Sequence, residues 1–315
     1  MDEQFKKDVE DGLSKKIKSL PSKYFYDKIG DALFVKIMHM SEYYLTRAEL
    51  EIFKNKSNQI IDYLQVHKDQ YFELIELGAG DGLKTKELLG CLLDRGFNFD
   101  YFPLDISQNA LNNLEESLIS ELPKLGIKKQ QGDYFEILAS LKSTKHPKVI
   151  LFLGSNIGNM SDEIAAEFIY ALGANLTKND KLLLGVDLKK AASIVLPAYN
   201  DSEGITRAFN MNLLNRINKE LGGNFDIEQF GHQPTYTEEE GIARSFLVSL
   251  KKQEVHIDAI NRSFEFEEGE KIATEISRKY SDEIIEQLIT DTDFEIVAKL
   301  TDEKMYFANY IFTKL

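Results

Sequence analysis

A glycine turn behind an apolar segment marks the place in this chain where a small molecule could bind. Residues 74–82 read Leu-Ile-Glu-Leu-Gly-Ala-Gly-Asp-Gly and lead into a helical run. A strand, a turn and a helix in this order form the first βα unit of a nucleotide-binding type of fold, in which Gly78 and Gly80 let the backbone approach a ligand closely. A dinucleotide site would need a third glycine where Leu83 stands. The turn therefore favours a cofactor without phosphates, of which S-adenosylmethionine is the common one.

Acidic residues farther along the chain could bind the nucleoside part of such a cofactor. Asp105 ends a second predicted strand, where its carboxylate can accept hydrogen bonds from two ribose hydroxyls. The alternative is that Asp105 only starts a turn and that Ser107 caps the next helix. Asp133, followed by the aromatic ring of Tyr134, suits an adenine amino group and a ring face, although this segment could equally be an ordinary turn.

The segment after a further apolar strand carries the sharpest local motif. The apolar residues 149–153 run into Gly-Ser-Asn-Ile-Gly-Asn at 154–159. Ligands of open α/β sheets bind beyond the carboxyl ends of the strands, and the amide of Asn159 can both donate and accept, which suits a zwitterionic group. The alternative is that Asn159 caps the following helix, a role for which Ser161 competes.

Composition argues against several classes of function. The chain has 315 residues and a formal net charge of −14, so nucleic acids and anionic membranes are not expected as partners. The single cysteine, Cys91, cannot form an internal disulfide, and the five histidines lack metal-ligand spacing, so no metal is expected. Neither a membrane span nor a signal-peptide pattern is evident. We therefore expect a soluble, cytoplasmic, monomeric protein that acts on a small molecule.

Secondary-structure patterns predict an α/β core. Helices alternate with strands, which are expected near 73–77, 100–105, 128–131, 148–153 and 181–186. Several of these strands are continuous apolar runs, as a parallel sheet requires. A helix at 281–289 precedes two strands, 294–300 and 306–312, which form a terminal hairpin. Such a hairpin usually ends the sheet of an S-adenosylmethionine-dependent methyltransferase. We expect a doubly wound, Rossmann-like class I methyltransferase core at 57–192 and 277–315.

The rest of the chain predicts a second, α+β domain that binds substrate. It is formed by the N-terminal block 1–56 and an insertion at 193–276, which contains a helix at 204–221 and shorter alternating segments. In the N-terminal block, Thr46 and Glu49 predict a capping box for a helix that runs from Arg47 to about residue 64.

Seven motifs, taken together and in order, resemble one family of enzymes. They are YFYD at 24–27, EYYLTRAE at 42–49, ELGAG at 76–80, FLGSNIGN at 152–159, LGVDL at 184–188, AYND at 198–201 and TEIS at 274–277. The pattern resembles the histidine-specific methyltransferases of ergothioneine biosynthesis from about residue 8 to the C-terminus. Members transfer three methyl groups from S-adenosylmethionine to the α-amino nitrogen of L-histidine, which gives hercynine, and the resemblance implies the same activity here.

The resemblance also implies roles for individual residues. Cofactor contacts are matched by Gly78, Lys84, Asp105, Asp133 and Tyr134, in addition to the turn residue Gly80. The groups that hold the substrate amine and carboxylate are matched by Tyr43, Asn159 and Tyr199, of which Tyr43 and Asn159 orient the reacting amine. The surroundings of the imidazole are matched by Tyr26, Glu275 and Ser277. From the residues alone, Glu275 and Ser277 could instead lie on the solvent face of an amphipathic strand.

Two positions depart from the family pattern and leave alternatives open. Asn156 stands where Thr is frequent, and Ser245 aligns with a Met that lines the imidazole side of the pocket. A smaller, polar residue at 245 could enlarge that pocket. The alternatives are an N-methyltransferase of another amino acid or of a tryptophan-like aromatic amine, and a non-catalytic adenosylmethionine-binding protein.

Overall fold

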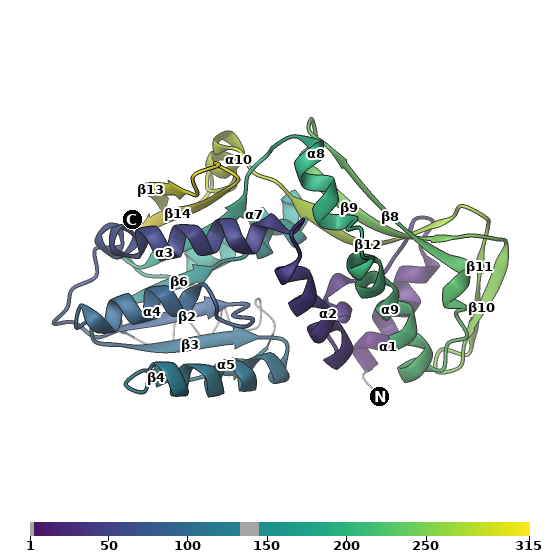
Figure 1. Ribbon diagram of the computed structural model, residues 1–315, viewed down its shortest axis with the longest axis horizontal. Helices are drawn as coiled ribbons and strands as arrows, with labels where there is room; N and C mark the ends of the chain where they lie inside the picture. Colours follow the sequence, from purple (N-terminus) through teal and green to yellow (C-terminus); the bar gives the residue numbers. More distant parts are fainter. Residues whose placement is uncertain (1–2, 133–144) are drawn as a thin grey trace. The chain divides into compact units, whose positions relative to one another are not determined.

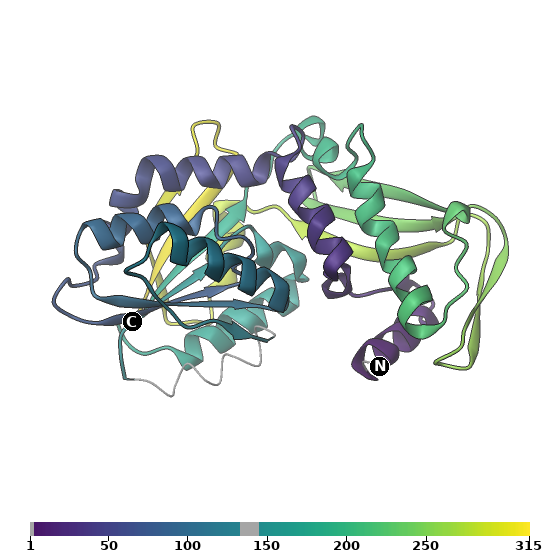
Figure 2. The same ribbon diagram turned by 60° about the horizontal axis from the view of Figure 1, so that its bottom comes forward.

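The computed structural model describes residues 3–132 and 145–315, and the chain divides into two compact units (Figures 1 and 2). Unit 1 consists of Met1–Tyr44 and Lys190–Ser277, and unit 2 consists of Leu45–Lys189 and Arg278–Leu315.

The elements of unit 2 alternate between helix and strand for most of their length. In chain order they are α3 (Tyr44–Leu64), β2 (Phe72–Leu77), α4 (Thr85–Asp94), β3 (Phe99–Asp105), α5 (Gln108–Glu121), β4 (Gly126–Ile127), β5 (Gln130–Gln131), β6 (Lys148–Phe152), η3 (Asn156–Asn159), α7 (Asp162–Asn175), β7 (Lys181–Asp187), α10 (Asp282–Leu288), β13 (Phe294–Thr301) and β14 (Phe307–Lys314).

The unit 2 sheet has eight strands in the order β13-β14-β7-β6-β2-β3-β4, with β5 also paired to β3. The strands from β7 to β4 and β5 run parallel. β14 is antiparallel to β7, and β13 is antiparallel to β14, so the predicted terminal hairpin is confirmed. This is the expected doubly wound class I methyltransferase core. The chain passes from β2 to β3 on one side and returns to β6 on the other, which places the topological switch point between β2 and β6.

Helices cover both faces of this sheet, because each face presents buried apolar side chains. On one face α3, α4 and α5 pack against the strands, and on the other face α7 and α10 do so. Ala48, Ile52 and Phe53 of α3 belong to the first of these cores. The boundary expected between residues 56 and 57 therefore differs from the observed division after Tyr44, since the whole buried face of α3 packs in unit 2.

The third predicted strand is broken in the structure. Instead of one strand at 128–131, β4 and β5 pair with β3 at separate places. The break falls at Lys128 and Lys129, whose ammonium groups lie 2.8 Å from Asp100 and 2.6 Å from Glu115. Residues 128–131 read Lys-Lys-Gln-Gln and, within the described part of the chain, pair only with β3, at the edge of the sheet, so no buried apolar run holds them in one continuous strand.

Unit 1 combines a four-stranded sheet, in the order β1-β12-β9-β8, with a two-stranded ribbon of β10 and β11. Its elements are α1 (Glu3–Ser14), β1 (Lys18–Ser19), η1 (Ser22–Phe25), α2 (Lys28–His39), α8 (Ala192–Val195), η4 (Leu196–Tyr199), α9 (Ile205–Leu221), η5 (Ile227–Gln229), β8 (Phe230–Thr237), β9 (Ile242–Ser249), β10 (Gln253–Ile257), β11 (Arg262–Phe266) and β12 (Lys271–Arg278). A single apolar core joins α1, α2 and α9 to these strands.

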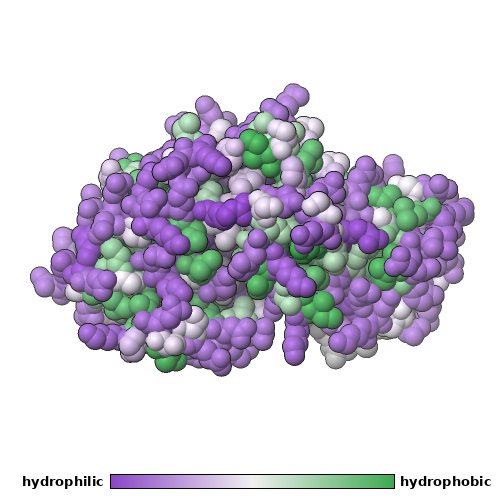
Figure 3. Space-filling model, in the orientation of Figure 1, coloured by the Kyte–Doolittle hydropathy of each residue, from purple (hydrophilic) through white to green (hydrophobic). Residues whose placement is uncertain are grey.

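The face of the molecule in Figure 3 is mostly hydrophilic, with apolar residues in small groups. Within residues 3–132 and 145–315, no helix has the length and apolar character needed to cross a membrane. The same part of the chain contains no group of three or more His, Cys, Asp or Glu side chains that could hold a metal ion.

Candidate functional site

The glycine turn after β2 has a backbone geometry that only glycine adopts readily. Gly78, Gly80 and Gly82 have φ angles of 74°, 56° and 65°. A Cβ built on Gly80 would meet no atom of the described residues within 4 Å, apart from its neighbours in the chain, so open space lies beside this part of the turn. The Leu104 carbonyl accepts hydrogen bonds from the Gly78 N–H at 2.8 Å and from the Ala79 N–H at 3.0 Å. The turn is therefore fixed to the end of β3 and leaves room for a ligand.

Asp105 lies beside this turn at the carboxyl end of β3. Its Oδ2 accepts a hydrogen bond from the Gly80 N–H at 3.0 Å, and its Oδ1 accepts one from the Ser107 N–H at 2.9 Å. Ser107 caps α5 by accepting from the Ala110 N–H at 3.1 Å. The turn at Asp105 and the cap by Ser107 are thus confirmed. These contacts do not exclude a ribose contact, because a carboxylate has about four lone-pair sites.

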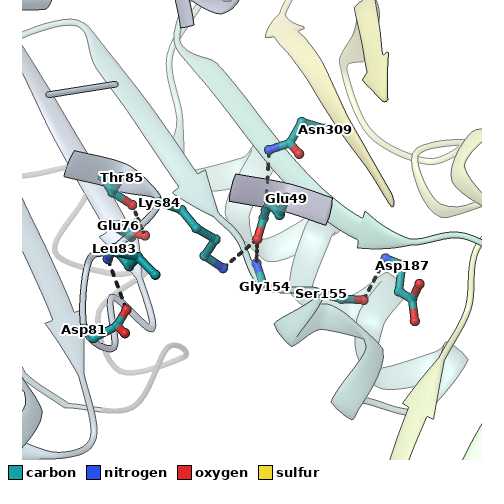
Figure 4. A network of polar contacts seen from close by, with 10 residues as sticks. All are labelled: Glu49, Glu76, Asp81, Leu83, Lys84, Thr85, Gly154, Ser155, Asp187 and Asn309. Carbon is teal, nitrogen blue, oxygen red and sulfur yellow. Dashed lines mark hydrogen bonds and ion pairs between the residues drawn. The ribbon is translucent and has the colours of Figure 1, made fainter. Parts of the chain in front are cut away.

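Lys84 follows the turn and contacts a buried carboxylate from α3 (Figure 4). Its Nζ lies 2.5 Å from Glu49 Oε2, which also accepts a hydrogen bond from the Gly154 N–H at 2.9 Å. The predicted capping box is wrong, because α3 already begins at Tyr44, two residues before Thr46. The carboxylate of Glu49 is directed into unit 2 instead of back to the start of its helix.

Glu76 is a second buried carboxyl group next to the turn. It accepts hydrogen bonds from the Tyr101 hydroxyl and, at 2.7 Å, from the Thr85 hydroxyl. Burial raises the pKa of Glu76 to about 7, although these hydrogen bonds and the charge of Lys84 act in the opposite direction. Glu76 thus anchors β2 to β3 and to the start of α4 with a carboxyl group that is partly protonated near neutral pH.

The turn after β6 presents Asn159 at its surface. Ser155 adopts a left-handed conformation with φ 59°, and its hydroxyl accepts a hydrogen bond from the Asp187 N–H at 3.0 Å. Ser161, not Asn159, caps α7 by accepting from the Ile164 N–H at 3.3 Å. The capping alternative for Asn159 is therefore wrong. Asn159 is exposed at the end of η3, which is consistent with its predicted contact to a ligand.

Aromatic rings surround two of the predicted substrate residues in unit 1. The ring of Tyr26 packs edge-on against Phe34 at 5.6 Å and against Phe209 at 5.8 Å between centroids. Phe34 also packs against Tyr43 at 6.5 Å. Tyr26 and Tyr43 thus belong to one cluster, built from α2, α9 and the segments that flank α2. Tyr199 is buried at the end of η4 in the same unit.

Glu275 and Ser277 both lie in β12, two positions apart, so they project from the same face of the strand. Ser277 is buried and Glu275 is half-buried, so the fully solvent-exposed alternative is wrong. The hydroxyl of Ser245, on β9, donates a hydrogen bond to Glu275 Oε2 at 3.4 Å. Thr274 fixes the neighbouring backbone by donating to the Ser245 carbonyl at 3.0 Å. Ser245, which departs from the family pattern, therefore contacts the carboxylate that is predicted to bind the imidazole.

The predicted residues fall into two sets by unit. Those in unit 1 are Tyr26, Tyr43, Tyr199, Glu275 and Ser277, and those in unit 2 are Gly78, Gly80, Lys84, Asp105 and Asn159. Asp133 and Tyr134 lie outside the described residues. The open space beside Gly80, the Asp105 carboxylate and the Lys84 ammonium fit a zwitterionic nucleoside such as S-adenosylmethionine.

Comparison with known proteins agrees with this geometry. A family described as "Histidine-specific methyltransferase, SAM-dependent" matches residues 5–314. The chain belongs to this family. Its cofactor is S-adenosylmethionine.

The methyltransferase is similar to several named relatives over most of its length. It is 34% identical over 298 residues to the histidine N-alpha-methyltransferase of Mycobacterium tuberculosis, which covers 95% of this chain and 91% of that protein. It is also 34% identical over 281 residues to the enzyme of the same name from Mycolicibacterium smegmatis, covering 89% and 86% of the two chains. Ergothioneine biosynthesis protein 1 of Schizosaccharomyces pombe is 32% identical over 94% of this chain but only 39% of its own length.

Three residues of the methyltransferase were missed by the sequence analysis. Phe34 and Phe209 complete the aromatic cluster, and Glu49 pairs with Lys84. Glu49 carries a sequence signal, because Leu45, Ala48, Ile52 and Phe53 are buried at helical spacing around it. A carboxylate within such an apolar stripe must find hydrogen-bond donors inside the protein.

Proposed function

We propose that this methyltransferase converts L-histidine to hercynine by three successive methyl transfers to the α-amino nitrogen. The proposal rests on family membership over residues 5–314. The observation in the structure that supports it best is the pair of Glu275 and Ser277, a half-buried carboxylate beside a buried hydroxyl on one strand. Such a pair can bind both nitrogens of an imidazole, since the carboxylate accepts from one nitrogen and the hydroxyl serves the other.

In this proposal the residues of unit 2 hold the cofactor. Asp105 accepts hydrogen bonds from the ribose, the turn at Gly78 and Gly80 lies along the ligand, and Lys84 contacts the charged amino-acid end. When bound, S-adenosylmethionine supplies an electrophilic methyl group on a sulfonium centre.

The residues matched to the substrate contacts position the amino acid for a direct displacement. Tyr43 and Asn159 orient the amine, Tyr199 contributes to binding of the amine and carboxylate, and Glu275 fixes the ring. The amine must lose a proton before each transfer, and an α-amino group has a pKa of roughly 8. Water can accept this proton, so the main contribution of these residues is alignment of the reacting atoms.

A product assay tests the proposal. The purified protein is incubated with S-adenosylmethionine and a mixture of the common amino acids, and methylated products are followed by mass spectrometry. Conversion of histidine alone to its trimethyl form is the expected result. Cofactor binding without any product from histidine would refute the proposed activity.

Ser245 favours a second candidate, N-methylation of a larger or more polar amino acid. Its side chain is short and only 1% exposed, and it interacts with the carboxylate proposed to bind the ring. Methylation of another amino acid in the same mixture would select this alternative. The monomeric state and the cytoplasmic location remain predictions.

A further inference from the structure

One buried carboxylate connects the two turns that flank the switch point of the unit 2 sheet (Figure 4). The side chain of Glu49 is 0% exposed. Its Oε2 binds the Lys84 ammonium, which follows β2, and the Gly154 N–H, which follows β6. These neighbouring strands lie on either side of the switch point, outside which ligands of open α/β sheets bind. Glu49 therefore fixes both walls of the place where a ligand is expected.

The surrounding backbone leaves just enough room for this ion pair. A Cβ on Gly185 would lie 2.1 Å from Glu49 Oε1, and a Cβ on Gly154 would lie 3.3 Å from Lys84 Nζ. Asn309 of β14 donates a hydrogen bond to Glu49 Oε1 at 3.4 Å. A glycine after β6, a glycine within β7 and an amide of β14 thus surround a single carboxylate, which indicates a fixed geometry.

We propose that Glu49 is the positioning residue of the cofactor site, which holds the Lys84 ammonium and the turn at Gly154 in the arrangement that binds the amino-acid end of S-adenosylmethionine. Glu49 itself is too buried to touch the ligand. The Lys84 side chain is 19% exposed, and an ammonium has three donors, so it can bind Glu49 and a ligand carboxylate together. This inference rests on the proposed binding of the cofactor at the turn in unit 2.

Glu49→Gln is the sharpest variant, because it removes the charge and keeps the shape. The glutamine oxygen can still accept from the Gly154 N–H. The Oδ1 of Asn309 is buried and has no hydrogen-bond partner among the described residues, so a turn of that amide lets it accept from the new NH2 group. The variant is therefore expected to fold. The Lys84 ammonium then has a neutral amide oxygen beside it in place of the Glu49 carboxylate, so the ion pair is lost while a weaker hydrogen bond can remain.

Asp180→Asn is the matched control. Asp180 is 1% exposed and lies 4.0 Å from the ammonium of Lys148, so it too is a buried carboxylate beside a lysine in unit 2. It precedes β7 and thus lies at the amino edge of the sheet, opposite to the turns. Loss of the Asp180 charge is expected to lower the midpoint temperature of thermal unfolding and to leave cofactor binding unchanged.

The assay is isothermal titration with S-adenosylhomocysteine, followed by initial-rate kinetics. Glu49→Gln should raise the Kd for this probe and the KM for S-adenosylmethionine at least tenfold, while the KM for histidine stays within twofold. If Glu49→Gln binds S-adenosylhomocysteine with wild-type affinity, the proposal is overturned. It is also overturned if Asp180→Asn loses as much affinity as Glu49→Gln does.

Lys84→Met gives an independent reading that does not depend on the folding of the Glu49 variant. Its affinity for S-adenosylhomocysteine should fall at least tenfold. Adding Glu49→Gln to this variant should lower the affinity little further, because the two residues act as one. Wild-type affinity in Lys84→Met would also overturn the proposal. If the wild-type protein binds the probe but does not methylate histidine, only the proposed activity fails, and the binding comparison still decides the role of Glu49.

Discussion

The perturbed carboxyl group of Glu76 predicts a specific dependence of stability on pH. Burial raises the pKa of Glu76 from an ordinary value of 4.5 to about 7. As the pH rises through this range, the unfolded chain has already lost a proton that the folded protein still holds. The free energy of unfolding therefore falls as the pH rises from 4.5 to 7.

The magnitude follows from the two pKa values. Each pKa unit corresponds to about 1.4 kcal/mol, so the full effect is roughly 3 kcal/mol, of which about 2.5 kcal/mol falls between pH 5 and 8.5. Glu76→Gln removes the titration but keeps hydrogen bonds to the hydroxyls of Tyr101 and Thr85, since an amide can accept from one and donate to the other. The free energy of unfolding of the variant should be closest to that of the wild type at pH 5. At higher pH the variant should become progressively more stable than the wild type.

Urea unfolding of both proteins, followed by circular dichroism at pH 5, 6, 7 and 8.5, measures this difference. Subtracting one protein from the other removes the contributions of all titrating groups that they share. Tyr101→Phe checks the sign, because it deletes a hydrogen bond that lowers the pKa of Glu76 and should extend the loss of stability to higher pH. A difference between Glu76→Gln and the wild type that does not change with pH would refute the reasoning.

Three further predictions concern the two ligands. Glu275→Ala should raise the histidine KM by about a hundredfold, since a hydrogen bond to a charged group contributes about 1.5–3 kcal/mol; an unchanged KM in initial-rate kinetics would remove Glu275 from the substrate site. Ser245→Ala deletes the donor 3.4 Å from Glu275 and should raise the same KM by less than about tenfold; an effect on the cofactor KM instead would contradict its placement. Asp105→Ala should weaken S-adenosylhomocysteine binding at least tenfold in calorimetry, whereas Ser107→Ala, which deletes only the cap of α5, should cost about 1 kcal/mol of stability and leave the affinity unchanged. Equal affinities in both variants would refute the ribose contact.

Local patterns in the sequence predicted the backbone of unit 2 well. The glycine turn, the apolar strands and the terminal hairpin are each encoded within about twenty consecutive residues or fewer, where periodicity and turn residues are informative. The third strand was predicted less well, because residues 128–131 are all polar and lie at the edge of the sheet, where burial does not hold a continuous strand.

Where the sequence allowed two roles for a residue, the contacts in the structure decided between them, and spacing alone does not reveal these contacts. For Asn159 and Ser161 the choice depended on which side chain reaches the Ile164 N–H, and Ser161 does so. At Asp105 the two interpretations are compatible, because the carboxylate forms the turn and remains beside the open space at Gly80.

Glu49 shows why the rest of the site was beyond local reasoning, and also how it could be found. Its sequence context fits a capping box with Thr46, and both residues have the required types and spacing. That interpretation ignores the buried stripe in which Glu49 lies, between Ala48 and Ile52. A carboxylate in such a stripe is costly unless paired, so burial predicts a distant cation, although only the tertiary structure identifies it as Lys84, 35 residues away. The same physical reasoning makes Glu49 a better candidate for a functional role than an exposed acid, because the protein retains a buried charge at the switch point where an apolar residue would pack more simply.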